Sequence, residues 1–302
     1  MGFPDLSLKD VLSYFDDKTL YFVIGTPKSG TTWLQQLLDS HREISCRGED
    51  DYFVVAKEIA EFLNRYNQSA ERINQIERLS RNAADSRFCT FTQADLPLLL
   101  EMAVRNLIAR ATYTDGCKII GTKFPNFTQF ADVFDPALGR PRYLHIVRDP
   151  RDVLVSAYYF NLLRDKDTME KIGGLASYMR QAIPFLEGQL RATLNFMNDG
   201  GGDRVLTVRY HELHQKPLAS LAEAFTFLGA DASEASVQAA VDAANFAKVN
   251  GGRSAGSEDR SNFYRKGVVG DWREKFDADC RQLVAASKLG DLMRQFDCPM
   301  ED

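Results

Sequence analysis

The sequence predicts a single α/β domain in which helices flank a central, mostly parallel β-sheet. Short apolar runs alternate with segments of helical periodicity, and parallel strands need helical crossovers of this kind. The first run, residues 20–24, leads through a glycine-containing loop into an amphipathic helix that begins at Thr31. The chain has 302 residues, of which 44% are hydrophobic, so it can bury one large core. We therefore expect one domain over residues 1–302.

The remaining elements follow in chain order. A polar lead-in with about one helical turn, residues 8–19, precedes the first strand. Further strands are expected at 44–46, 118–122, 142–147 and 205–208, because each is an apolar run that ends at a turn signal. Helices are expected at 31–38, 151–160, in two stretches within 174–198, at 217–228, at 234–246 and after Trp272. Residues 52–113 are largely helical by pattern with a break near 85–92, which indicates an insertion between two strands at about 52–116.

Composition excludes several classes of protein. The net charge of −5 disfavours a nucleic-acid-binding protein, which normally has a basic surplus. Five widely spaced cysteines and four scattered histidines show no metal-ligand spacing, so we expect neither disulfides nor a metal site. No stretch has the roughly 18 apolar residues of a membrane span, and the N-terminus lacks the apolar core of a signal peptide. A cytoplasmic protein is the expectation.

The loop after the first strand predicts an anion site. Residues Gly25 to Gly30 separate the strand from the helix, and such a loop directs backbone N–H groups and the positive end of the helix dipole at one point. The glycine spacing matches that of a Walker A loop. However, Thr31 stands where that motif has its lysine, and Lys28 lies two residues before Gly30. A nucleoside triphosphatase is therefore disfavoured.

The sequence Thr26-Pro-Lys-Ser-Gly-Thr-Thr-Trp33 resembles the 5′-phosphosulfate loop of sulfotransferases that use 3′-phosphoadenosine 5′-phosphosulfate (PAPS). The resemblance implies the P-loop-like sulfotransferase fold and PAPS as sulfuryl donor, with 3′-phosphoadenosine 5′-phosphate (PAP) as product. It implies that Lys28 neutralises the charge that develops on the leaving group. The other residues it assigns to nucleotide binding in this loop are Ser29, Gly30, Thr31, Thr32 and Trp33.

Two further segments resemble the part of these enzymes that holds the 3′-phosphate. After the fourth strand, residues 147–156 carry Arg148 and, eight residues later, Ser156. An arginine can chelate a phosphate through its planar fork, and a serine adds a hydroxyl. Near the C-terminus, residues 265–272 match the family pattern R-K-G-x-x-G-D-W. Arg265 and Lys266 would add two cations to the 3′-phosphate, and Gly267 would let the backbone approach it closely.

The adenine would be held by aromatic residues. Tyr210, after the fifth strand, stands where the family has a tyrosine that hydrogen-bonds the base, and Trp33 stands where a residue stacks on it. Trp33 is also explained by packing in the core. For Phe246, stacking on adenine and core packing are equally supported.

The expected catalytic base differs from that of the cytosolic sulfotransferases. Their histidine at the end of the third strand is replaced by Lys123 in this sequence. The segment after the second strand instead resembles the one that supplies a catalytic glutamate in tyrosylprotein and heparan sulfate sulfotransferases. Glu49 is therefore the candidate base, with Lys123 beside the transferred group. An acidic helix cap explains the next two residues, Asp50 and Asp51.

The sequence thus predicts transfer of a sulfuryl group from PAPS to an alcohol or phenol of a small acceptor, by in-line displacement without a metal. Two other functions stay open: a P-loop kinase acting on a nucleotide or small molecule, and a nucleotide-binding protein without activity. Residues 52–116 and the loop 161–175 are expected to wall the acceptor site. The Gly- and Ser-rich segment 250–261 is a candidate lid. The acceptor and the oligomeric state are not predicted.

Overall fold

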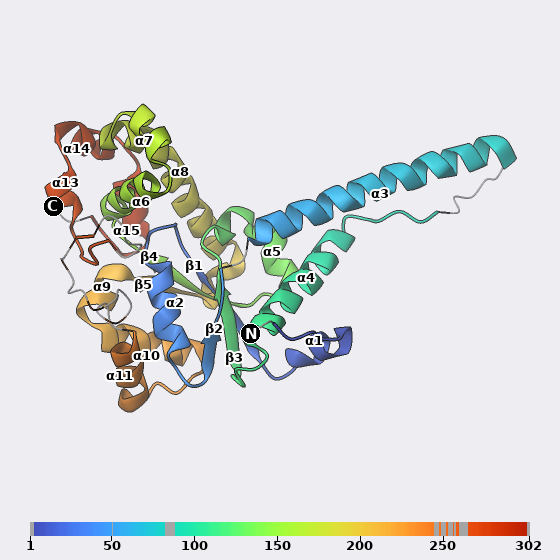
Figure 1. The fold of residues 1–302 in the computed structure, drawn as a ribbon, viewed down its shortest axis with the longest axis horizontal. Coiled ribbons are helices and arrows are strands. Elements are labelled where there is room, and N and C mark those ends of the chain that lie inside the picture. The colour runs from blue at the N-terminus through green and yellow to red at the C-terminus, as the bar shows by residue number, and fades with distance from the viewer. Residues whose placement is uncertain are drawn as a thin grey trace.

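A computed structural model of the chain describes residues 3–49, 51–81, 88–244 and 265–300, together with positions 248, 252, 256, 258 and 259. Its centre is a five-stranded sheet with the order β2-β3-β1-β4-β5 (Figure 1). Every pairing in this sheet is parallel. The strands are β1 (Thr19–Ile24), β2 (Ile44–Cys46), β3 (Ile119–Lys123), β4 (Arg142–Val147) and β5 (Val205–Arg209). The predicted α/β domain with a parallel sheet is confirmed.

Helices cover both faces of the sheet (Figure 1). In the first half of the chain they are α1 (Leu8–Tyr14), α2 (Thr31–Asp39), α3 (Tyr52–Arg81), α4 (Asp95–Thr112), the 3-10 turn η1 (Phe127–Phe130), α5 (Ala131–Ala137) and α6 (Pro150–Arg164). The next group is α7 (Lys166–Ile172), α8 (Leu175–Phe196), η2 (Met197–Gly201), η3 (Gly202–Arg204), α9 (Tyr210–Gln215), α10 (Pro217–Leu228) and α11 (Glu234–Ala243). The last described helices are α13 (Trp272–Lys275), α14 (Ala278–Ala285) and α15 (Leu289–Gln295).

Strand β1 is apolar from Leu20 to Ile24 because helices cover both of its faces. Tyr21 and Val23 pack into the core cluster that includes residues of α2 and α10, whereas Phe22 and Ile24 pack into the opposite cluster with residues of α4 and α5. Successive side chains of a strand point to opposite faces. A strand that is covered on both faces therefore needs a continuous apolar run along its buried part.

Several predicted boundaries differ from those of the structure. Strand β3 extends one residue further than predicted and includes Lys123. The segment 161–175 is not a loop, because it contains the end of α6 and all of α7. Within the predicted range 174–198 there is one long helix, α8, that continues through Pro184, instead of two stretches. The helical turns at Phe127–Ala137 were not expected, since Pro136 lies among them.

The predicted insertion between β2 and β3 consists mainly of α3 and α4. Helix α3 has 30 residues, and most of its length projects away from the rest of the molecule (Figure 1). The return segment that follows residue 87 runs back beside α3 towards α4. In the described part of the chain, no helix combines the length and the apolar character that crossing a bilayer requires.

Candidate functional site

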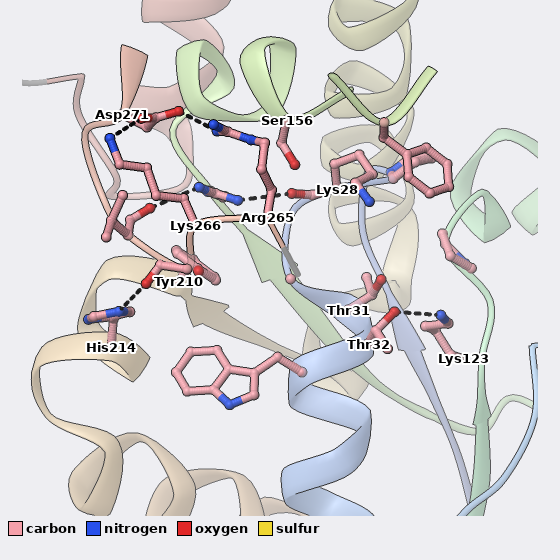
Figure 2. A pocket seen from close by; sticks show the side chains of 18 of the residues that line it. Lys28, Thr31, Thr32, Lys123, Ser156, Tyr210, His214, Arg265, Lys266 and Asp271 are labelled. Carbon is pink, nitrogen blue, oxygen red and sulfur yellow. Dashed lines mark hydrogen bonds and ion pairs between the residues drawn. The ribbon is translucent and has the colours of Figure 1, made fainter. Parts of the chain in front are cut away.

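The predicted site residues meet at a cavity of about 400 Å³ beside the carboxyl ends of the strands. In parallel sheets this edge is where ligands bind. Figure 2 shows Lys28 reaching this space from the loop after β1, and Arg265 and Lys266 reaching it from the C-terminal segment. Six cationic side chains line the cavity against two acidic ones: Lys28, Lys123, Arg148, Arg164, Arg265 and Lys266, against Glu49 and Asp271.

The loop after β1 is shaped by its glycines. Gly30 has a φ of 105° and precedes α2. A Cβ atom at this position would lie 2.6 Å from the ring of Tyr210, so both the conformation and the space require glycine. Lys28 also has a positive φ, 72°, which is uncommon for a residue with a side chain. The first N–H groups of α2, at Thr31, Thr32 and Trp33, have no acceptor within the helix.

Lys28 lies in a partly buried, positively charged environment. Its ammonium is 3.8 Å from the centre of the Phe160 ring, which α6 contributes. Burial lowers the pKa of Lys28 to about 8, and the positive charges of Arg148 and Lys123 act in the same direction. The Glu49 carboxylate opposes the shift. Lys28 therefore stays mostly protonated at pH 7 and loses its proton as pH rises through about 8.

Lys123 and Glu49 form an ion pair at the cavity wall. The side chain of Lys123 is only 5% exposed, and its Nζ donates a hydrogen bond to the Thr32 hydroxyl over 2.8 Å (Figure 2). Gln35 donates to the carbonyls of Cys46 and Gly48, which holds the segment before Glu49 against α2. The candidate base therefore has a defined place beside the loop.

Arg148 follows β4 and has several partners. Its guanidinium donates to the carbonyls of Lys28 and Val268 over 3.3 and 3.1 Å, and it stacks over the Tyr210 ring at 4.4 Å. Its Nε atom is buried and donates to no described residue. Ser156, from α6, lines the same cavity (Figure 2). Arg148 thus links the loop after β1, Tyr210 and the C-terminal segment.

The buried carboxylate of Asp152 joins the two predicted 3′-phosphate motifs. It accepts hydrogen bonds from the backbone N–H groups of Gly270 and Trp272 over 2.8 and 3.1 Å. It also lies 3.6 Å from Arg148. Beside it, the guanidinium of Arg151 stacks on the Trp272 ring at 3.7 Å. These contacts hold the segment 265–272 against the start of α6.

Asp271 forms ion pairs with both cations of the C-terminal segment. Its carboxylate forms ion pairs with Arg265 and with Lys266, the latter over 2.7 Å. Glu258 also pairs with Arg265, and Glu274 with Lys266. Burial would raise the pKa of Asp271, but hydrogen bonds from Lys266 and Arg265 outweigh it and hold the pKa below its ordinary value. Asp271 is therefore ionised near neutral pH.

An aromatic group closes the side of the cavity near α9. The Trp33 ring lies 5.8 Å from that of Tyr210 and 6.0 Å from that of His214, and its Nε1 donates to the carbonyl of Ala244. His214 Nε2 lies 3.0 Å from the carbonyl oxygen of Gly267. His214 was not predicted. It lies one helical turn after Tyr210 and shares a face of α9 with it.

Most predicted site residues line this cavity, with two exceptions. Ser29 is fully buried, and its N–H and hydroxyl both donate to the carbonyl of Thr26, so it closes the loop. Phe246 lies outside the described residues, as does most of the segment 250–261. Phe160 and Arg164 line the cavity without having been predicted. The sequence did contain a sign of this, because the two residues follow Ser156 by four and eight positions along one helix and so lie on a similar side of it.

The described residues at this site include neither a cluster of metal ligands nor a part of the projecting insertion. Among the described residues there is no group of three or more His, Cys, Asp and Glu that could hold a metal ion. Within the described part of 52–116, no residue belongs to the cavity wall.

Part of the chain is similar in sequence to curated sulfotransferases. The curated relatives include Sulfotransferase 2B1 of Rattus norvegicus, 25% identical over 156 residues that cover 45% of this chain and 43% of that protein. The corresponding Mus musculus protein is 24% identical over 152 residues, which cover 45% and 44%. The matched part is thus less than half the length of either relative.

Solved structures share the fold. The mouse sulfotransferase SULT7A1 complexed with PAP has a TM-score of 0.57 at 16% identity, over 96% of this chain and 90% of that one. Sulfotransferase STF9 from Mycobacterium avium has a TM-score of 0.55 at 14% identity, over 97% and 80%. The sequence pattern described as "Sulfotransferase domain" matches residues 18–288. The chain therefore belongs to the sulfotransferase domain family.

Proposed function

We propose that this chain transfers the sulfuryl group of PAPS to a hydroxyl group of a small acceptor and releases PAP. The convergence of six cationic side chains on one cavity carries the proposal, because the chain as a whole has a net charge of −5. A nucleotide with charged groups at both its 5′ and 3′ positions needs two sets of cations. Lys28 and Lys123 form one set, and Arg148 with the segment 265–267 forms the other.

The residues present fit this nucleotide. The buried Nε of Arg148, which donates to no described residue, is suited to a phosphate oxygen. The N–H groups at the start of α2 and the close approach at Gly30 suit the 5′-phosphate. A mouse protein of the same fold has been crystallised with PAP. We assign the nucleotide contacts on this basis to Lys28, Thr31, Thr32, Arg148 and Ser156, and also to Trp33, Tyr210, Arg265, Lys266 and Gly267.

Bound PAPS supplies a sulfur atom that bonds to the acceptor oxygen while its bond to the bridging oxygen of the 5′-phosphate breaks, with the electron pair leaving on that oxygen. Glu49 takes the proton of the acceptor hydroxyl. Lys28 neutralises the charge that develops on the leaving group. Lys123 holds Glu49 in place through the ion pair. These cations supply the positive charge that Mg²⁺ provides in phosphoryl transfer, so we expect turnover to persist in a chelator.

The acceptor would enter beside Pro125 and Phe160, which give this side of the cavity an apolar wall. An aromatic or apolar alcohol fits such a wall. Three expectations stay predictions. They are that residues 52–116 cover the acceptor, that the segment 250–261 closes over the nucleotide, and that the protein is cytoplasmic.

Two measurements test the proposal. Calorimetry should give tight binding of PAP and much weaker binding of ATP with Mg²⁺, because a kinase would need an acidic side chain after β4 where this chain has Arg148. Turnover of PAPS should then be measured against a panel of phenols and aliphatic alcohols in the presence of EDTA. Preference for ATP with Mg²⁺ would support a kinase. Tight PAP binding without turnover on any acceptor would support a nucleotide-binding protein without activity.

A further inference from the structure

Arg164 is a cation of the cavity wall that belongs to neither of the two sets assigned to the nucleotide. It is exposed, and its guanidinium lies 5.5 Å from the centre of the Phe160 ring. It forms no hydrogen bond or ion pair with another described residue. Asp165, the next residue, caps α7, because its carboxylate accepts a hydrogen bond from the backbone N–H of Thr168 over 3.1 Å. Arg164 thus brings a positive charge to the cavity without an anion from the described part of the chain.

The course of α6 separates Arg164 from the 3′-phosphate motif. The helix begins at Pro150, two residues after Arg148, and Arg164 is its last residue. A cation suits the last turn of a helix, but this does not explain why the side chain lines the cavity. Ser156 and Arg164 are eight residues apart, which is about 12 Å along a helix. Arg164 therefore lies at the other end of the wall that α6 provides.

The ring of Phe160 connects Arg164 with the place of the reaction. The Lys28 ammonium is 3.8 Å from the centre of this ring, and the Arg164 guanidinium is 5.5 Å from it. The two charges are therefore no more than about 9 Å apart. In the proposed function Lys28 marks the leaving group, and Phe160 belongs to the apolar wall of the acceptor side. A molecule built on one aromatic ring can span this distance.

Charge balance indicates what Arg164 binds. PAPS carries several negative charges, and Glu49 adds another beside the acceptor hydroxyl. An acceptor that is itself an anion would be repelled from this cavity unless a separate cation met it. A neutral acceptor that packed on Phe160 would instead take water away from Arg164 and give it no partner, which is unfavourable. The position of Arg164 therefore favours an acceptor with a negative charge.

We propose that Arg164 binds an anionic group of the acceptor, so that the substrate is a hydroxylated acid. Its apolar or aromatic body packs on Phe160, its hydroxyl points towards Glu49, and its anionic group meets the guanidinium. A planar carboxylate can accept two parallel hydrogen bonds from an arginine. The inference rests on the proposed function for the reaction, but the contact between Arg164 and the acid can be measured without turnover.

Three phenols serve as matched probes: 4-hydroxyphenylacetate, 4-hydroxyphenylacetamide and tyramine. They share a hydroxyl-bearing ring and are similar in size, but their other ends are negative, neutral and positive. A saturated carbon separates the charged group from the ring, so the hydroxyl groups have similar reactivity. With PAPS as donor, kcat/KM for the acid should exceed that for the amide by about 10-fold, the scale of a hydrogen bond to a charged group. Tyramine should be the poorest acceptor.

Substitutions of Arg164 test the contact. Arg164→Gln should remove the preference for the acid over the amide, Arg164→Lys should keep part of it, and Arg164→Glu should shift the preference to tyramine. Lys166→Gln is the control for the loss of one positive charge, because Lys166 pairs with Glu170 over 3.5 Å and does not line the cavity. It should keep the full preference. Affinity for PAP, measured by calorimetry, should stay within a few-fold in every variant.

Three results would overturn the inference while the proposed function stands. These are equal kcat/KM for the acid and the amide, a preference for the acid that survives Arg164→Gln, and a large loss of PAP affinity in that variant, which would place Arg164 at the nucleotide.

Failure of the proposed function gives a different result, because none of the three phenols would then be sulfated. In that case the PAP-saturated protein is titrated with the acid and with the amide in a calorimeter. Tighter binding of the acid that Arg164→Gln abolishes would support the inference, and equal binding of both probes would overturn it.

Discussion

The buried ammonium of Lys123 is paired with the carboxylate of Glu49, whose side chain is 55% exposed. The two positions therefore tolerate change differently. Removing the whole Glu49 side chain leaves a buried ammonium with one partner fewer, which is costly. A change of Glu49 to Gln keeps an oxygen near Lys123 and removes only the basic carboxylate.

Glu49→Gln should lower turnover of PAPS about 100- to 10,000-fold, the range that a positioned base contributes. Affinity for PAP by calorimetry should stay within a few-fold of the unchanged protein. Glu58→Gln, on the exposed side of α3, is the matched control and should be fully active. An active Glu49→Gln enzyme would show that another group takes the proton.

Lys28 should give nucleotide binding a pH dependence. Its pKa of about 8 means that the cation is lost as pH rises through that value, so affinity for PAP should fall there. Lys28→Arg stays charged and should remove this fall. Calorimetry with PAP across the pH range measures both proteins, and an identical fall in the Arg variant would assign the effect to another group.

The same shift affects stability with the opposite sign. Between about 8 and 10.5 the folded protein has released the Lys28 proton while the unfolded chain still holds it. Unfolding therefore takes up a proton in this window, and the contribution of Lys28 to the free energy of unfolding increases as pH rises.

Asp152→Asn should specifically weaken recognition of the 3′-phosphate. One oxygen of the carboxylate would become an NH₂ group that faces a backbone N–H, so the segment 265–272 would separate from α6. Loss of about 1 to 2 kcal/mol corresponds to about a 10-fold smaller ratio of affinities for PAP and adenosine 5′-phosphate. Asp167→Asn on the surface of α7 is the control. An unchanged ratio would mean that Asp152 does not position the phosphate site.

His145 should make the protein sensitive to acid. Burial lowers its pKa to about 4 in the folded state from 6.5, so the unfolded chain binds more protons between these values. The free energy of unfolding should therefore fall by up to about 3 kcal/mol as pH decreases through this window. Urea unfolding at a series of pH values measures the slope. His145→Phe should reduce it, whereas His211→Gln should not.

The sheet was predictable because its strands are apolar runs bounded by glycine, proline or charge, and β2 and β4 have the predicted bounds. The cavity residues that belong to sequence motifs were predictable, because the strand ends of a parallel sheet meet at one edge. Asp152 and His214 were missed because their roles depend on contacts with residues more than 50 positions away. The projection of α3 was not predictable, because periodicity identifies apolar faces but not what covers them.

The ion pairs of Asp271 affect how a nucleotide leaves. Because Arg265 and Lys266 already have this carboxylate as a partner, an arriving phosphate exchanges one anion for another instead of meeting bare charge. The gain in binding free energy is only the difference between the interactions of the two cations with the phosphate and with Asp271. When the nucleotide leaves, both cations regain Asp271 as a partner. A pocket with its own internal counter-ion can thus recognise a multiply charged product and still let it dissociate after every cycle.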